Sequence, residues 1–147
     1  MPELTPQRIA ELEKRAATIR RHLIRTFHRG GGGHYGGCLS IIEILTALYF
    51  HAMRYDPDNP RDPGRDRFIL SKGHASVALD CTLAEAGFFP VAWLEKYMTP
   101  DSPITTHPDM HRTPGVEMSS GSLGHGICVA LGMALAARMD GASYRVF

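Results

Sequence analysis

Three segments rich in glycine and histidine are the parts of this 147-residue sequence whose residue types could do chemistry. They are Gly33–Gly37 (GHYGG), Ser71–Ser76 (SKGHAS) and Ser119–Gly126 (SSGSLGHG). Glycine lets a ligand approach the main chain closely. A helical pattern follows each segment, and the first turn of a helix offers unpaired N–H groups that suit a phosphate. The pattern therefore predicts one composite site for a phosphorylated ligand or cofactor.

Histidines in or near these segments are the candidate reactive side chains. His34 is surrounded by six glycines, which would pack a core poorly, so we interpret it as a functional loop residue rather than a core histidine. His74 follows a strand candidate and precedes a helix, where open α/β sheets bind ligands; a helix cap is its alternative. His107 and nearby His111 have the alternative of being solvated loop residues. No site role is assigned to His22, His28 or His51.

Helices must hold these segments in place. Thr5 and Pro6 begin an amphipathic helix of roughly twenty residues that ends at Gly30. Ser40 and Glu43 match a capping box, and the apolar residues around and after them predict a buried helix. Further helices are expected over residues 75–87, 91–98 and 127–138. Gly87 and Gly141 mark the ends of the first and the last, and the last consists of small residues that allow close packing. Residues 99–117 are expected to form an irregular loop.

Residues 67–70 and 144–147 are the strand candidates. The order strand, turn, helix, strand implies a parallel sheet, so the expected fold class is α/β. Two strands alone would leave sheet edges exposed and a core unfinished. We therefore expect residues 1–147 to be a helix-rich part of a parallel-sheet fold that is incomplete on its own.

Composition excludes few functions but disfavours some. Sixteen basic and fifteen acidic residues give a net charge of +1, which does not favour nucleic-acid or membrane-surface binding. Cys38, Cys81 and Cys128 lack metal-type spacing and fit reduced thiols in the cytoplasm. No apolar run is expected to span a membrane. The glycine order of residues 121–126 is not the dinucleotide fingerprint, and the histidines lack the carboxylate pattern of a metal site.

Five blocks of this sequence, in the same order, resemble the N-terminal part of transketolases, which are thiamine diphosphate enzymes. The resemblance implies that His34 contacts the donor sugar, that His107 holds a substrate hydroxyl and that His74 lies near the cofactor diphosphate. It makes these three histidines the catalytic candidates. The family's cofactor-lining backbone matches Gly121, Ser122 and Leu123. The five blocks are Gly33–Gly37, Asp66–His74, Thr106–Pro108, Pro114–Glu117 and Gly121–Gly126.

The resemblance also implies a cofactor and a reaction. Thiamine diphosphate acts as the electron sink while a two-carbon unit passes from a ketose to an aldose. In relatives, a Gly-Asp-Gly motif that binds Mg²⁺ or Ca²⁺ comes after the position of Phe147, so the metal ligands are expected from a partner chain, together with the pyrimidine-binding domain and its activating glutamate. Two departures are His125, where the family usually has glutamine, and Ser122, where some members have proline.

These observations predict the N-terminal subunit of a split, cytoplasmic transketolase, covering residues 1–147 and active only with partner chains. It would act on a ketose or ketose phosphate and bind neither nucleic acid nor membrane. One alternative is another thiamine diphosphate reaction, such as synthesis of a deoxy-ketose phosphate. A second is a non-catalytic interaction subunit or truncated remnant, because a shared fold does not guarantee activity.

Overall fold

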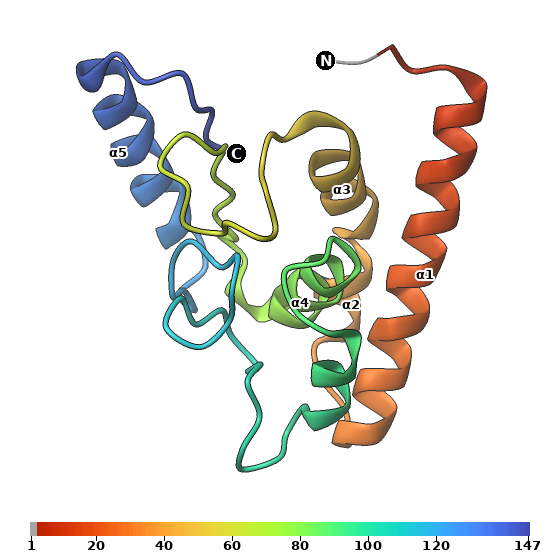
Figure 1. Ribbon diagram of the computed structural model, residues 1–147. Helices are drawn as coiled ribbons and strands as arrows, with labels where there is room; N and C mark the ends of the chain where they lie inside the picture. The colour runs from red at the N-terminus through yellow and green to blue at the C-terminus, as the bar shows by residue number, and fades with distance from the viewer. Residues whose placement is uncertain (1–2) are drawn as a thin grey trace.

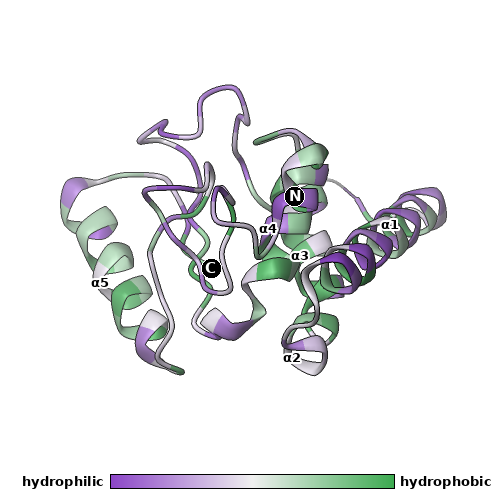
Figure 2. Ribbon diagram, turned by 90° about the horizontal axis from the view of Figure 1, so that it is seen from below, coloured by the Kyte–Doolittle hydropathy of each residue, from purple (hydrophilic) through white to green (hydrophobic). Residues whose placement is uncertain are grey.

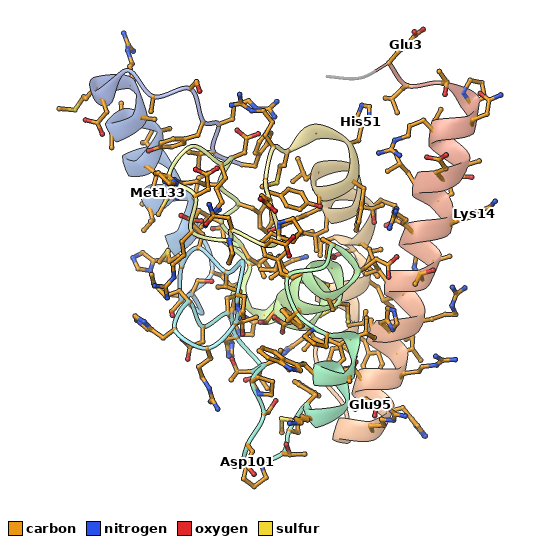
Figure 3. All side chains as sticks on the ribbon, viewed as in Figure 1. Glu3, Lys14, His51, Glu95, Asp101 and Met133 are labelled. Atoms are coloured by element: carbon orange, nitrogen blue, oxygen red, sulfur yellow. The ribbon has the colours of Figure 1, made fainter. Side chains whose placement is uncertain are left out.

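The computed structural model describes residues 3–147, and its longest helix is α1 (Pro6–Gly30). Its start and end agree with the sequence prediction: the Thr5 hydroxyl accepts a hydrogen bond from the Arg8 N–H at 3.2 Å, and Gly31 closes the helix at φ 83°. Lys14 points away from the body (Figure 3). The buried apolar face of α1 comprises Ala16, Ile19, Leu23 and Phe27.

The chain continues through α2 (Tyr35–Leu39), α3 (Ile42–Ala47) and a π-helical turn (Leu48–Ala52). The sequence did not predict α2, and the predicted capping box is wrong. The Ser40 hydroxyl donates to the Gly37 carbonyl, α3 starts without a side-chain cap, and Glu43 pairs with Arg20 instead. Burial of α3 and the π-turn is one-sided, since Ile44 is 56% exposed; the buried apolar residues are Ile42, Leu45 and Tyr49.

Helix α4 (Ser76–Glu85) is the centre of the molecule (Figure 1). Every residue from 76 to 84 is buried, because α1, α2, α3 and the 3-10 helix Val91–Lys96 all pack against α4. A 3-10 turn, Gly73–Ala75, leads into it. The predicted helix over 75–87 is therefore confirmed, and the predicted helix over 91–98 is a shorter 3-10 helix.

Helix α5 (His125–Asp140) lies on the opposite side of the molecule from α1 (Figure 1). It ends at Gly141, as predicted, and is hydrophobic over much of its circumference (Figure 2). Within residues 3–147 nothing packs closely against its small residues, because Gly126 and Ala137 are its only buried members. Leu131 is 61% exposed.

The two strand candidates meet at a single parallel bridge between Arg67 and Val146. The Arg67 N–H donates to the Arg145 carbonyl at 2.8 Å, and the Ile69 N–H donates to the Phe147 carbonyl at 2.9 Å. The parallel pairing agrees with the expectation, but the described residues contain no longer strand. An extended ladder requires neighbouring strands, so the structure of residues 3–147 is helix-rich and only its bridge is β-like.

One stretch, Tyr35–Ala52, is long and apolar enough to cross a membrane by length and composition. This corrects the expectation that no apolar run approaches that length. The stretch is divided between α2, α3 and the π-turn, and its buried residues Cys38, Ile42 and Leu45 belong to the hydrophobic core with α1 and α4. Its apolar character therefore has an explanation in core packing.

Candidate functional site

The three histidines singled out from the sequence come together from three separate elements. His34 precedes α2, His74 lies in the 3-10 turn before α4, and His107 lies in the irregular loop. The ring centroids of His34 and His74 are 4.9 Å apart, and those of His74 and His107 are 4.7 Å apart. His34 and His107 are 6.3 Å apart. Their imidazoles therefore form one cluster, the three-histidine cluster.

His34 is positioned by close packing between α1 and the glycine segment before it. A Cβ added to Gly33 would lie 2.1 Å from the Phe27 ring, so only glycine lets the chain turn here against α1. Phe27 also packs edge-on against Tyr35, with ring centroids 4.6 Å apart. The residue next to His34 is thus held by α1, while His34 itself remains exposed.

Hydrogen bonds join the segment before His74 to the glycine-rich segment before α5. The Ser71 carbonyl accepts from the Gly124 N–H and the Ser71 hydroxyl accepts from the Ile127 N–H, both at 3.2 Å. The Ser120 hydroxyl donates to the Leu70 carbonyl at 2.9 Å. These contacts span about fifty residues of sequence. They join the segments Ser71–Ser76 and Ser119–Gly126 into one structural unit.

Replacement of Gly73 by alanine should damage this unit. A Cβ at Gly73 would lie 2.8 Å from the Ser120 carbonyl oxygen and 2.9 Å from the Gly121 Cα, and backbone atoms cannot give way cheaply. We expect a loss of about 1–3 kcal/mol in the free energy of unfolding, measured by urea denaturation.

Gly132→Ala is the matched control for Gly73→Ala. A Cβ at Gly132 meets nothing within 4 Å in α5, so helix propensity should make this change neutral or stabilising by up to about 1 kcal/mol. Equal effects of the two substitutions would contradict the predicted clash at Gly73.

The segment matched to the cofactor backbone lies beside the cluster. A Cβ built on Gly121 would be 3.6 Å from the His107 ring, so the missing side chain leaves the backbone open next to that imidazole. Ser122 is exposed and Leu123 is 68% exposed. The main chain over residues 121–123 is therefore accessible to a ligand lying against the cluster.

Burial and the neighbouring histidines keep His107 neutral. Burial, followed by the positive charge that His74 and His34 would carry, lowers the pKa of His107 below its usual value. The Thr106 hydroxyl lies 3.3 Å from the His107 Nδ1, and the Thr105 hydroxyl donates to the His107 carbonyl. A neutral imidazole can accept a proton, which suits His107 for general-base work on a hydroxyl.

His74 has a buried ring nitrogen that nothing in residues 3–147 satisfies. Its Nδ1 has no hydrogen-bond partner there, and an unpaired buried polar atom is costly. The backbone carbonyl of His74 accepts a hydrogen bond from the Cys38 thiol at 3.8 Å. Burial raises the pKa of Cys38, so this thiol stays protonated. The Nδ1 of His74 is thus a fixed polar atom that a ligand could engage.

Sequence reasoning did not single out Lys72 or Ser40 as site residues. The Lys72 ammonium donates to the Ser40 hydroxyl at 2.9 Å, joining the end of α2 to the turn that carries His74. Within residues 3–147, Lys72 forms no ion pair with a carboxylate. The position of Lys72 two residues before His74 was the signal available in the sequence.

Residues 3–147 contain no group of three or more histidine, cysteine, aspartate or glutamate side chains that could hold a metal ion. His111 and His125 are both exposed. Figure 3 shows His51 near the end of the helical segment that contains α3. The described site therefore offers imidazoles, an ammonium group and open backbone.

The sequence matches the family described as "Transketolase, thiamine diphosphate binding domain" over residues 12–146. It is 46% identical over 138 residues to one of the subunits of the apulose-4-phosphate transketolase of Actinobacillus succinogenes, covering 93% of this chain and 50% of that protein. It is 47% identical over 130 residues to the 6-deoxy-6-sulfo-D-fructose transketolase subunit SqwG of a Clostridium species, covering 88% of this chain and 47% of that protein. The chain spans about half the length of these curated relatives.

Solved structures agree with the sequence relationship. Transketolase from Pichia stipitis in complex with sedoheptulose 7-phosphate superposes with a TM-score of 0.85 at 30% identity, covering 92% of this chain and 21% of that chain. Transketolase from Campylobacter jejuni superposes with a TM-score of 0.84 at 30% identity, covering 92% of this chain and 22% of that chain.

Proposed function

This chain belongs to the transketolase family, and from that premise we propose that it is the N-terminal part of the thiamine diphosphate binding domain of a transketolase that moves a two-carbon ketol unit from a ketose to an aldose. The observation that carries the proposal is the meeting of His34, His74 and His107 beside the open backbone of Gly121. Three polar rings on one accessible surface suit a polyhydroxylated substrate.

The residues of the site fit thiamine diphosphate. His74 has a buried Nδ1 without a partner in the described residues, and we propose that it binds the diphosphate. The open backbone over Gly121, Ser122 and Leu123 would line the same ligand. When bound, the cofactor supplies the electron sink that allows the carbon–carbon bond of the ketose to break.

The other two histidines serve the sugar in this proposal. His34 is exposed at the edge of the cluster and would hold the donor near its reacting carbon. His107 has a lowered pKa and so is neutral at pH 7; it would hold a substrate hydroxyl and accept its proton. Both relatives named above act, by their names, on anionic sugars, and we infer a ketose phosphate or similar anionic ketose as donor.

The metal ion falls outside the described residues in this proposal. They do not form a site for Mg²⁺ or Ca²⁺, so we assign its ligands to polypeptide other than residues 3–147. We also infer that other transketolase subunits supply the pyrimidine-binding domain. The parallel Arg67–Val146 bridge would then belong to a larger parallel sheet. The three free cysteines support a cytoplasmic location.

The proposal is tested by co-purifying the protein with the chains encoded beside it and assaying two-carbon transfer. We expect His107→Ala to lower kcat/KM by about 100-fold, because a positioned proton acceptor contributes on that order. His28→Ala is the control, since His28 is an exposed histidine in the last turn of α1 to which no site role is assigned. If every reconstituted complex is inactive and binds no thiamine diphosphate, the proposal fails.

A further inference from the structure

A second group of charged side chains lies outside the three-histidine cluster. A cleft of about 550 Å³ runs between residues 60–67 and residues 110–117, and none of the three histidines lines it. Its size lies within the range of about 300–1,000 Å³ typical of small-molecule sites. The charged or titratable residues that line the cleft are Arg61, Arg65, Arg67, His111, Arg112 and Glu117.

The cleft contains an ion triad of two arginines and one glutamate, so its positive charges outnumber its negative charge. Arg65 and Arg67 both bind Glu117, the second at 2.6 Å. The side chains of Arg65, Arg67 and Glu117 are only 10%, 20% and 8% exposed. Two guanidinium groups thus share one carboxylate, and the second positive charge is met only by neutral groups: Arg65 also donates to the Pro60 and Asp66 carbonyls, and Arg67 donates to the Pro63 carbonyl and lies over the Tyr144 ring. Such a charge is costly, and a bound anion would offset that cost.

Two further arginines add positive charge at the rim. Arg61 and Arg112 are exposed. The Arg112 guanidinium donates to the Ser102 carbonyl at 2.7 Å, which orients it, while Arg61 forms no ion pair within residues 3–147. Four arginines and one glutamate give the lining a net charge of +3, with His111 counted as neutral.

Neighbouring carboxylates do not cancel this charge from within the cleft. Asp62 accepts the Gly64 N–H at 2.8 Å and Asp109 accepts the His111 N–H at 2.9 Å. Neither aspartate lines the cleft. Both shape the loops that form its walls, so Glu117 is the single acid facing the four arginines.

We propose that this cleft binds a small molecule carrying a phosphate group or paired carboxylates. Guanidinium groups match both kinds of anion with paired N–H donors. Met110, Pro114 and Val116 also line the cleft and provide apolar surface for the remainder of the ligand. The site goes beyond the proposed two-carbon transfer, because its residues are separate from the three histidines.

The test is isothermal titration calorimetry of the full chain with two probes, pyrophosphate and citrate. Comparing their affinities shows whether the cleft prefers phosphate groups or carboxylates. The variant Arg61→Ala/Arg112→Ala removes two exposed rim charges and should weaken binding of the preferred probe at least tenfold. The matched control, Arg21→Ala/Arg25→Ala, removes two exposed arginines from α1 and should bind as the unmodified protein does.

His74→Ala separates this site from the proposed cofactor site. Binding that survives His74→Ala but is lost in Arg61→Ala/Arg112→Ala supports the cleft whether or not two-carbon transfer is ever observed. Binding lost only with His74→Ala assigns the anion to the three-histidine cluster and overturns the proposal. Absence of binding by both probes, or equal weakening in the two arginine pairs, also overturns it.

Discussion

Asp66→Asn is expected to lower the free energy of unfolding by about 1–3 kcal/mol, the usual cost of leaving donors without their charged acceptor at a buried site. Asp66 is fully buried, and its carboxylate accepts the N–H groups of Arg54 at 2.9 Å and Arg145 at 2.8 Å. Both guanidinium groups bind it as well, Arg54 at 3.2 Å and Arg145 at 2.5 Å. The asparagine amide would turn one acceptor into a donor that faces these donors, while the half-exposed arginines keep their contacts with the Ser143 and Ala52 carbonyls.

The contribution of Asp66 to the free energy of unfolding should decrease as the pH falls. Burial acts to raise the pKa of Asp66, but the hydrogen bonds from Arg145 and Arg54 outweigh it and hold the pKa well below the ordinary value of 3.8. A carboxyl with a depressed folded pKa contributes stability that is complete above its unfolded pKa and declines as pH falls toward the folded pKa. Urea denaturation should therefore show the cost of Asp66→Asn in full at pH 7 and a smaller cost below about pH 4.

Asp101→Asn is the control for Asp66→Asn. Asp101 is exposed at the tip of a loop (Figure 3), so its replacement should change stability by less than about 0.5 kcal/mol. A similarly small change for Asp66→Asn would show that the Arg54–Asp66–Arg145 contacts do not hold residues 144–147 against the preceding segment.

Asp80→Asn, unlike Asp66→Asn, should raise the free energy of unfolding at neutral pH and so stabilise the protein. Asp80 lies in α4 at 1% exposure, forms no ion pair within residues 3–147, and accepts one long hydrogen bond of 3.4 Å from Ser76. Burial raises its pKa well above 3.8, and the Ser76 bond offsets little of this. Asp80 is therefore a carboxylic acid that folding keeps protonated above the pH at which the unfolded chain ionises.

The cost of holding that proton grows with pH. When a group binds its proton more tightly in the folded chain than in the unfolded chain, the free energy of unfolding falls as pH rises. It falls by about 1.4 kcal/mol per pH unit between the unfolded and the folded pKa of that group. Asparagine has a similar shape and does not titrate. We expect the advantage of Asp80→Asn, measured by urea denaturation, to be larger at pH 7 than at pH 5.

Neighbouring groups do not obscure this measurement. The nearby Cys38, Cys81 and Tyr97 all have pKa values raised above their usual values by burial, so they do not titrate between pH 5 and pH 7. Asp101→Asn again serves as the control and should give a stability curve parallel to that of the unmodified protein. Parallel curves for Asp80→Asn would contradict a raised pKa at Asp80.

Much of the local structure follows from the sequence alone, because it depends on contacts between neighbouring residues. Thr5 and Gly31 bound α1 through its cap and a positive φ, and Gly87, at φ 92°, follows the end of α4. The glycine setting of His34 and the order of the five blocks identified the family. The capping box at Ser40 failed because a tertiary partner, Lys72, lies at its hydroxyl and the chain turns once more before α3 begins.

Tertiary structure decided what no local pattern encodes. Packing of α2, the turn before α4 and the loop brings His34, His74 and His107 within 4.7–6.3 Å of one another. Partners distant in sequence and burial set the properties of single groups: Arg145 lowers the pKa of Asp66 from 79 residues away, and the core raises that of Asp80. The sequence by itself determined α1, α4 and α5, the family and the candidate histidines. Their meeting and their charge states depend on burial and distance, which only the folded chain defines.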